Sequence, residues 1–394
     1  EFMRINSYGK SLWTTTITDT IRLENTFDHY KDVGWSTMLN DARALAIPLG
    51  QAQGEDWDYS SYDFYTIVSR GGIGGYAGVA QVGGRRSHLQ STGLRTAGHE
   101  FGHNLGLGHA HYHYSKGLSP RSDITYQGLS DMEYGHRFSI MSAQSGSDFN
   151  NPALPHFTAH EKWRLDWLTD ADILDITDGS ANGVHRVYQN DLEEATGLRA
   201  LRLPSGGELS KYWVSYRAAW ASPNRSSDQQ YLLNGAMFNW TGSGGGRSRL
   251  LDMTPYSDDG SHSGASWTRD NRDKWDAPLA IGRTYSDRDV GVHVTPVARG
   301  GIAPNEYLDI YVHVEGGEPV ELVRETDSCR VIVPDAGTAE GLAWTAVGFD
   351  DSSWASGSLG AGYERNSGYG EFIGVDVEVD MYDRREGLYI RIPV

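Results

Sequence analysis

The segment HEFGHNLGLGH, residues 99–109, follows the pattern HExxHxxGxxH. His99 and His103 are four positions apart, so on a helix both imidazoles lie on one face and can bind one metal ion at about 2.0 to 2.1 Å. Gly106 would let the chain leave that helix in a backbone conformation that is costly for residues with a Cβ atom, which brings His109 round as a third ligand. Three neutral imidazoles leave the fourth position of a zinc ion open to water.

The sequence around this motif predicts a helix over residues 92–105. One apolar stripe runs along it at spacings of 3, 4 and 4, formed by Leu94, Ala97, Phe101 and Leu105. Glu100 is not a ligand in this arrangement; it would stand beside the open coordination position and act as general base for the zinc-bound water. A purely structural zinc is disfavoured, because such sites close with four protein ligands and favour cysteine, which this segment lacks.

Composition sets the class of protein. The 394 residues suggest two or three domains, and 52 acidic against 34 basic residues give a net charge of -18. That charge repels phosphate backbones and anionic lipid, so we expect neither nucleic acid nor a membrane surface as partner. Cys329 is the only cysteine, which excludes an intramolecular disulfide, and we expect it to be a buried small apolar residue.

Patterning divides the chain into three predicted domains. Residues 1–170 read as an α/β (α+β) domain, with a helix over 35–47, a strand over 62–69 and a glycine-rich run over 71–84. A capping-box spacing, Thr158 to Glu161, starts its last helix. Residues 171–316 read as an all-β sandwich of strand-sized runs, at residues 184–188, 212–220, 232–240, 249–253, 290–297 and 307–314.

The C-terminal part, residues 317–394, follows a predicted linker at residues 316–319. Its segment Phe349-Asp-Asp-Ser-Ser-Trp354, with the glycines after it, resembles the opening of galactose-binding-like β jelly-roll modules attached to bacterial secreted enzymes. By that resemblance we expect about half a module, a partial jelly roll, with glycan contact through this segment.

The zinc motif resembles that of the metzincin clan of metalloendopeptidases. That clan also carries a methionine turn beneath the zinc, and Phe138-Ser-Ile-Met141-Ser, 32 residues after His109, supplies the candidate. Met141 would form an apolar floor rather than a ligand; an ordinary core methionine is the alternative. The resemblance implies a zinc-dependent endopeptidase that is secreted, from a bacterium, and acts on protein or glycoprotein substrates.

Within the clan the chain is most similar to the gametolysin-like (autolysin) metallopeptidases. The similarity lies in the run from His103 to Ala110, in the glycine-rich segment 76–84 and in the tryptophan-rich segment 163–168. Ala110 separates the chain from astacin-like enzymes, which carry Glu directly after the third histidine, and from adamalysin-like enzymes, which carry Asp there.

In metzincins an edge strand above the zinc pairs with the extended substrate, and the resemblance places it at residues 76–82. Glycine-rich backbone there would offer free N–H and C=O groups for strand addition. An ordinary glycine-rich loop is the alternative. A dinucleotide-binding reading of residues 72–77 fails, because the stretch that follows stays strand-like and glycine-rich where that fingerprint requires a helix.

Four further residues near the motif are weaker candidates for the site. His111 and His113 would be outer hydrogen-bond partners or alternative ligands, or simply part of a solvated loop. Tyr134 and His136 come shortly before the methionine turn and would be able to donate a hydrogen bond to an oxyanion.

Two acidic clusters carry oxygens suited to structural calcium. They are Asp56 with Asp58, and Asp258-Asp259-Gly260. Neither matches a full calcium-loop spacing, and solvated surface is the plain alternative.

The sequence therefore predicts a secreted zinc endopeptidase, with His99, His103 and His109 as ligands and Glu100 as base. The rival hypothesis is a zinc-containing adhesin that binds glycan or matrix through its C-terminal half and has an inactive metal site. The presence of Glu100 favours the enzyme, because binding alone would not require a base.

Overall fold

The computed structural model describes most of the chain, namely residues 1–113, 120–121, 131–142, 156–218, 230–242, 246–255, 257, 274, 276–315, 323–324, 326–334, 343–365 and 368–392. It is a mixed α/β structure with more strand than helix, in agreement with the predicted combination of an α+β part and β-rich parts. It divides into two compact units, Glu1–Gly317 and Glu318–Val394. The predicted linker at residues 316–319 lies outside the described residues, and the division between the two units falls within it.

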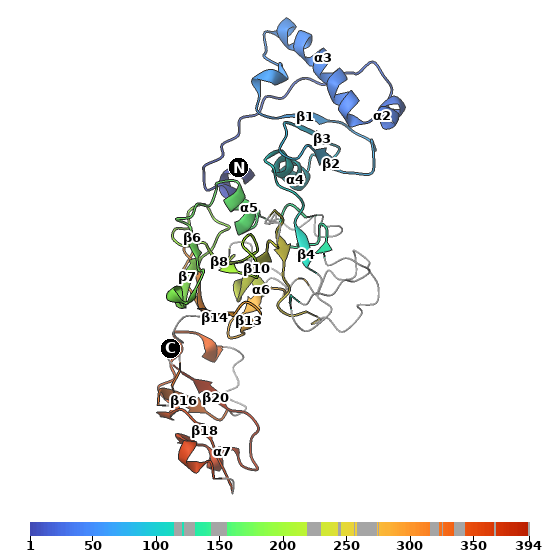
Figure 1. The fold of residues 1–394 in the computed structure, drawn as a ribbon. Helices are drawn as coiled ribbons and strands as arrows, with labels where there is room; N and C mark the ends of the chain where they lie inside the picture. The colour runs from blue at the N-terminus through green and yellow to red at the C-terminus, as the bar shows by residue number, and fades with distance from the viewer. Residues whose placement is uncertain are drawn as a thin grey trace. The chain divides into compact units, whose positions relative to one another are not determined.

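Short helices open the first unit: α1 (Phe2–Asn6), α2 (Phe27–Val33) and α3 (Trp35–Gln53). The last contains the predicted helix at 35–47 and extends it by about two turns. The sharp change of direction between α2 and α3 occurs at Gly34, whose φ of 85° suits a residue without Cβ. In Figure 1 α2 and α3 lie together at one end of this unit, next to β1.

A three-stranded sheet follows, with the order β1-β3-β2. Its strands are β1 (Tyr65–Val68), β2 (Gly78–Ala80) and β3 (Arg86–Leu89), where β3 runs parallel to β1 and antiparallel to β2. Helix α4 (Leu94–Asn104) comes directly after β3 and lies beside β2 in Figure 1. Within the described chain β2 pairs on one side only, so it is an edge strand next to α4.

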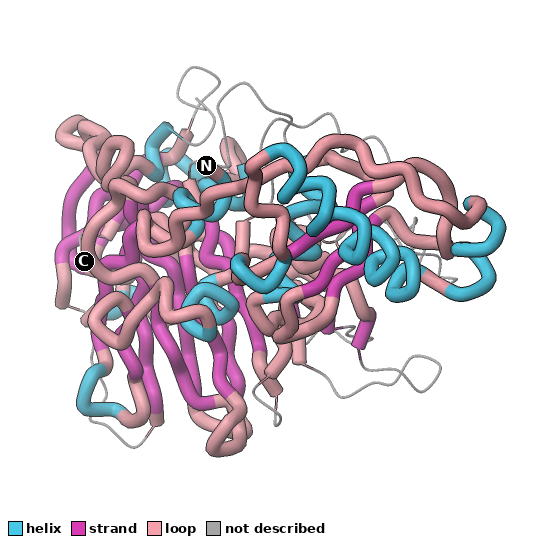
Figure 2. Tube along the Cα trace, turned by 90° about the horizontal axis from the view of Figure 1, so that it is seen from above, coloured by secondary structure: helices cyan, strands magenta, loops and turns pink. Residues whose placement is uncertain are grey.

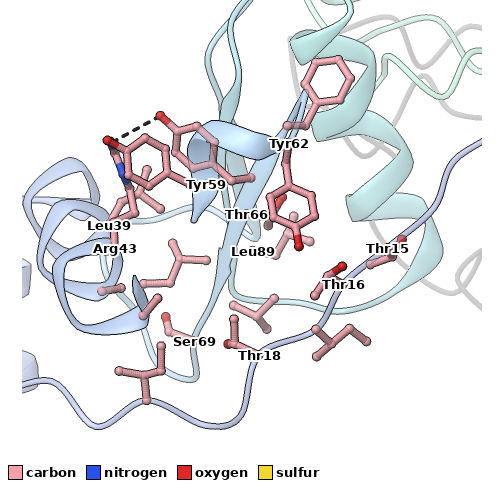
Figure 3. Close-up of a pocket in the computed structure, with 18 of the residues that line it drawn as sticks. Thr15, Thr16, Thr18, Leu39, Arg43, Tyr59, Tyr62, Thr66, Ser69 and Leu89 are labelled. Atoms are coloured by element: carbon pink, nitrogen blue, oxygen red, sulfur yellow. Dashed lines mark hydrogen bonds between the residues drawn. The ribbon is translucent and has the colours of Figure 1, made fainter. Parts of the chain in front are cut away.

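A cavity of about 1800 Å³ lies between residues 11–25 and the α3 face of this sheet. Figure 3 shows Thr15, Thr16 and Thr18 of that extended segment across the cavity from Leu39 and Arg43 of α3. Its lining includes Phe101 and Leu105 of the predicted apolar stripe but none of the three motif histidines. The cavity therefore lies on the opposite side of α4 from the histidine face.

Helix α5 (Ala159–Arg164) begins with the predicted capping box. The Thr158 hydroxyl accepts from the Glu161 N–H at 3.2 Å, and the Glu161 carboxylate accepts from the Thr158 N–H at 2.7 Å. The capping-box prediction is thus confirmed. The helix ends at Arg164, before the apolar run is complete, and residues 165–168 form a turn in which Trp167 and Leu168 are buried.

Two sheets make up the β-rich part of the first unit. The eight-stranded sheet has the order β5-β4-β11-β10-β9-β8-β6 with β12 also paired to β10, and its strands are β4 (His111–His113), β5 (Asp131–Met132), β6 (Ile173–Asp175), β8 (Ala200–Pro204), β9 (Lys211–Ser215), β10 (Gly235–Trp240), β11 (Arg249–Leu250) and β12 (Leu279–Ala280). The four-stranded sheet has the order β13-β14-β15-β7, with β7 (Gly183–Tyr188), β13 (Tyr285–Asp287), β14 (Val292–Gly300) and β15 (Tyr307–Val314).

One apolar core is shared by both sheets, as in a β-sandwich. Val187, Val294 and Ile310 of the smaller sheet are fully buried together with Val214 and Phe238 of the larger one. The strands run alongside one another in Figure 2, where they appear in magenta. Strand β15 shows the predicted alternation, because Leu308, Ile310, Val312 and Val314 all point into this core.

The larger sheet contains strands from both sides of residue 170. Strand β4 follows the histidine motif directly and pairs in parallel with β11, with His111 opposite Arg249 and Tyr112 opposite Leu250. The predicted boundary at 170 therefore lies inside the first unit, and one sheet connects the motif to the β-rich part.

The second unit contains a three-stranded sheet of β17 (Ala355–Ser358), β16 (Ser328–Ile332) and β20 (Tyr389–Arg391), in that order, and a two-stranded sheet of β18 (Ala361–Gly362) and β19 (Val375–Asp376). Cys329 and Val331 of β16 are buried with Val375 and Val377. The expectation that Cys329 is a buried apolar residue is confirmed.

Candidate metal centre

Helix α4 places His99 and His103 one turn apart, and the chain returns His109 to the same point. One nitrogen from each of the three rings lies within 4.8 Å of the other two. The return begins at Gly106, whose φ of 99° lies in the left-handed region, and it is held by the Leu107 N–H, which donates to the Gly102 carbonyl at 3.0 Å. The three predicted ligands therefore converge, as their spacing indicates.

Each of the three imidazoles is oriented through its Nδ1 atom. Nδ1 of His99 lies 2.8 Å from the Ile140 carbonyl oxygen, and Nδ1 of His103 lies 2.8 Å from the Leu107 carbonyl oxygen. Nδ1 of His109 lies 2.6 Å from a Glu133 carboxylate oxygen. Carbonyl and carboxylate oxygens only accept, so each Nδ1 carries the hydrogen and each Nε2 presents a lone pair.

Two of these Nε2 atoms lie very close together. Nε2 of His103 and Nε2 of His109 are 3.1 Å apart, and neither carries a hydrogen to bridge the gap. Two nitrogens bound tetrahedrally to one zinc at about 2.0 to 2.1 Å would be roughly 3.3 Å apart. The pair is therefore close enough for both nitrogens to bind one ion, and the three histidines could hold a metal that takes nitrogen donors.

Burial keeps the three rings neutral. It lowers the pKa of His99 to about 3, and it also lowers the pKa of His103 and of His109. At His109 the hydrogen bond to Glu133 raises the pKa and so opposes part of this effect. Only the neutral imidazole binds a metal, so the site is ready to do so at pH 7 without first releasing protons.

Glu133 is a member of the site that the sequence analysis missed. It follows β5, and the hydrogen bond from His109 lowers the pKa of its carboxyl. The next residue, Tyr134, has a left-handed φ of 62°, and its ring centroid lies 3.7 Å from that of His109. The spacing of the motif contains no signal for Glu133, because it comes 24 residues after its partner.

Glu100 follows His99 in α4 and lies against the edge strand β2. It is buried, and burial raises the pKa of its carboxyl to about 7. A Cβ atom at Gly78 of β2 would lie 2.7 Å from Cγ and 2.8 Å from Oε1 of Glu100. Glycine at position 78 is thus what lets the strand approach the carboxylate so closely.

Met141 packs directly against α4 between the first two histidines. It is fully buried with Leu107, Ala110 and Phe157. A Cβ atom at Gly102 would lie 2.3 Å from the Met141 sulfur. The Met141 carbonyl accepts from the Ala110 N–H at 2.8 Å, so the turn at residues 138–142 contacts the motif at both ends.

Tyr134 and His136, paired in the sequence analysis, have different surroundings. The Tyr134 ring lies at the cluster, where burial raises its pKa. His136 is fully buried and shares a hydrogen bond with the Asn239 amide of β10, and its Nδ1 accepts from the Phe138 N–H at 3.2 Å. It is not part of the histidine cluster.

The other described candidates are not members of the histidine cluster. His111 and His113 form β4 and are buried, so the solvated-loop interpretation is wrong. Asp56 accepts from the Asp58 N–H, and Asp58 accepts from the Ser60 N–H to cap a short 3-10 turn, which is an ordinary role for aspartates in loops. Asp258-Asp259-Gly260 lies outside the described residues.

Comparisons of the chain with protein-family models, with curated proteins and with solved structures found no match. In the described part of the chain no helix is both long and apolar enough to cross a membrane.

Proposed function

We propose that the chain is a zinc-dependent endopeptidase of metzincin-like organisation. The observation that carries the proposal is the convergence of three neutral imidazoles, each with its Nδ1 hydrogen held by an acceptor, beside a buried carboxyl whose pKa is raised to about 7. Nitrogen donors in this arrangement are typical of catalytic zinc, which keeps one position open.

Zinc, when bound, supplies Lewis acidity: it polarises a carbonyl and makes water acidic enough to lose a proton near neutral pH. The Glu100 carboxylate would take a proton from the attacking water and later give it to the leaving amine. A pKa near 7 suits a group that must both take up and release a proton at neutral pH. The hydrogen-bonded Ile140 and Leu107 carbonyls and Glu133 keep the three rings from turning.

The substrate would bind along β2. This strand pairs with β3 on one side, and its Gly78 lies against Glu100. A peptide added antiparallel to the open edge would pass its scissile bond close to the carboxylate and the histidines. Main-chain pairing of this kind recognises an extended polypeptide of many sequences, which supports protein or glycoprotein substrates.

The resemblance stated above supports secretion from a bacterium as part of the same proposal. In the second unit Tyr369 and Phe372 are exposed, with ring centroids 6.5 Å apart. Exposed aromatic faces of this kind suit glycan contact, which would hold the enzyme near a glycosylated substrate.

The proposal is tested by metal content and hydrolysis on the same sample. We expect about one zinc per chain by elemental mass spectrometry, with casein hydrolysis lost on chelation and regained on return of zinc. The Glu100→Gln variant is expected to keep its zinc and to lose hydrolysis by about 100-fold or more. The matched control is Glu24→Gln, an exposed glutamate, which is expected to hydrolyse casein like the parent.

Two outcomes would contradict the proposal. Glu100→Gln with parental hydrolysis would exclude the base assignment. Stoichiometric zinc with no hydrolysis of any protein or peptide would favour the adhesin hypothesis, and glycan binding by the second unit would then be measured.

A further inference from the structure

The turn at residues 138–142 controls the orientation of one metal ligand. The Ile140 carbonyl accepts from His99 at 2.8 Å, and the Ile140 N–H donates to the His156 carbonyl at 3.2 Å. A Cβ atom at Gly98 would lie 2.7 Å from Cδ1 of Ile140, so α4 and this turn are in close contact. A shift of the turn would therefore move the acceptor on which the His99 ring depends.

Arg217 reaches this turn from the β-rich part of the chain. It lies two residues beyond the end of β9 and is 1% exposed. Its Nη1 donates to the Phe138 carbonyl at 2.6 Å, and its Nη2 donates to the Phe157 carbonyl at 2.8 Å. One guanidinium thus holds two backbone segments in a fixed separation.

Both carbonyls are next to the contacts of Ile140. Phe138 is two residues before Ile140 in the turn, and Phe157 follows His156, whose carbonyl accepts from the Ile140 N–H. The guanidinium therefore holds both backbone segments that position Ile140, the turn itself and the segment at residues 156–157. Among the described contacts this is a direct connection from β9 to the support of a metal ligand.

A buried cation at this position has a cost that an apolar side chain would not have. Burial lowers the pKa of the Arg217 guanidinium, and the nearby carboxylates of Asp191 and Glu161, which are 1% and 3% exposed, act in the opposite direction. Glu161 also accepts from the Ser139 hydroxyl at 2.9 Å, within the same turn. Two carbonyl acceptors and two nearby acidic side chains thus surround this two-pronged donor.

We propose that Arg217 is a positioning residue for the metal centre, which acts through the Phe138 and Phe157 carbonyls to hold Ile140 against His99. It follows that the β-rich region is part of the metal centre and not an independent accessory domain. This inference rests on the proposed metal site and concerns its geometry and affinity, not the hydrolysis that follows.

The test uses the full chain and two readouts besides activity: zinc affinity by competition with a chelator, and the visible absorption of the cobalt-substituted protein, which reports ligand geometry. Arg217→Met is expected to weaken zinc binding about 10- to 100-fold and to change the cobalt bands. Arg217→Lys, which can reach one carbonyl at a time, is expected to fall between Arg217→Met and the parent.

Arg199→Met is the matched control. Arg199 is also a buried arginine that donates to two backbone carbonyls, those of Leu192 and Ala195, and its contacts within the described part of the chain do not include the turn at residues 138–142. Its removal is expected to lower thermal stability while zinc affinity stays within about twofold of the parent. The two arginine variants thus separate loss of a buried hydrogen-bonded cation from loss of the support of His99.

Parental zinc affinity and cobalt bands in Arg217→Met would overturn the inference, and so would equal losses in Arg199→Met. If Arg217→Met does not fold, Arg217→Lys decides by the same two criteria. A parent chain that binds no cobalt would overturn the metal centre itself, and with it this inference. If the parent binds cobalt and the Arg217 variants bind it in the same way, this inference alone is overturned.

Discussion

Replacement of Gly102 by alanine tests the packing beneath the metal centre. In an unobstructed helix interior this change stabilises a protein by about 1 kcal/mol, because alanine has the higher helix propensity. Here the new Cβ would lie 2.3 Å from the Met141 sulfur and 3.0 Å from Cε1 of Phe157. Ordinary contact is about 3.5 to 4.0 Å, so the sulfur has to move by more than about 1 Å.

The magnitude follows from these two opposing effects. Both Met141 and Phe157 are fully buried, so we take the upper part of the overpacking range, about 2 to 3 kcal/mol. Subtraction of the propensity gain leaves a net loss of about 1 to 2 kcal/mol. The turn that moves with Met141 also carries Ile140, so we expect zinc affinity to fall together with stability.

The assay is urea unfolding of the metal-free chain, with zinc affinity by chelator competition. Ala97→Gly, in the same helix, calibrates helix propensity and is expected to lose about 0.5 to 1 kcal/mol. In a Met141→Ala background the cost of Gly102→Ala is expected to shrink by at least about 1 kcal/mol, because the clash is gone. A Gly102→Ala variant that is about 1 kcal/mol more stable than the parent, with unchanged zinc affinity, would refute the reasoning.

Three further results are expected. Gly106→Ala, at a φ of 99°, is expected to cost about 1 to 2 kcal/mol in urea unfolding and to weaken zinc binding, and unchanged binding would show that the return of His109 does not depend on glycine. Glu133→Gln is expected to lower zinc affinity about 10-fold in chelator competition, because the His109 ring loses a charged acceptor; an effect below twofold would contradict this role. Burial lowers the pKa of His88 from 6.5 to about 4. Between pH 6.5 and pH 4 the unfolded chain therefore binds a proton at His88 that the folded chain does not, and the folded state loses stability as the pH falls through this range. The free energy of unfolding in urea is measured at pH 7 and at pH 4.5, and its decrease between the two is expected to be roughly 1 to 3 kcal/mol smaller in His88→Gln than in the parent. An equal decrease in both proteins would exclude His88 as the cause.

The features that the sequence predicted correctly depend on neighbours along the chain. The four-residue spacing of His99 and His103 is a property of any helix, and the capping box of Thr158 and Glu161 needs only three residues of separation. The alternation in β15 likewise reflects the two-residue period of a strand. Such patterns are readable because the geometry is the same in every protein.

The support of the site depends on contacts between distant segments. His99 is oriented by a carbonyl 41 residues away, and His109 by a carboxylate 24 residues away. Arg217 holds the Phe138 carbonyl across 79 residues. A backbone carbonyl leaves no signature in the type of its residue, so no pattern along the chain could have identified the two carbonyl partners.

The same distinction separates His111 and His113 from their expected setting. Two polar residues alternating with tyrosines after a metal motif suggest a loop, whereas pairing with β11, whose residues come more than 130 positions later, buries them in a sheet. The sequence by itself determined that the three histidines converge, and which local elements carry them, because helix and turn geometry is local. Only the tertiary structure decided what holds those ligands in position, because that depends on which remote strands and turns the folded chain brings together.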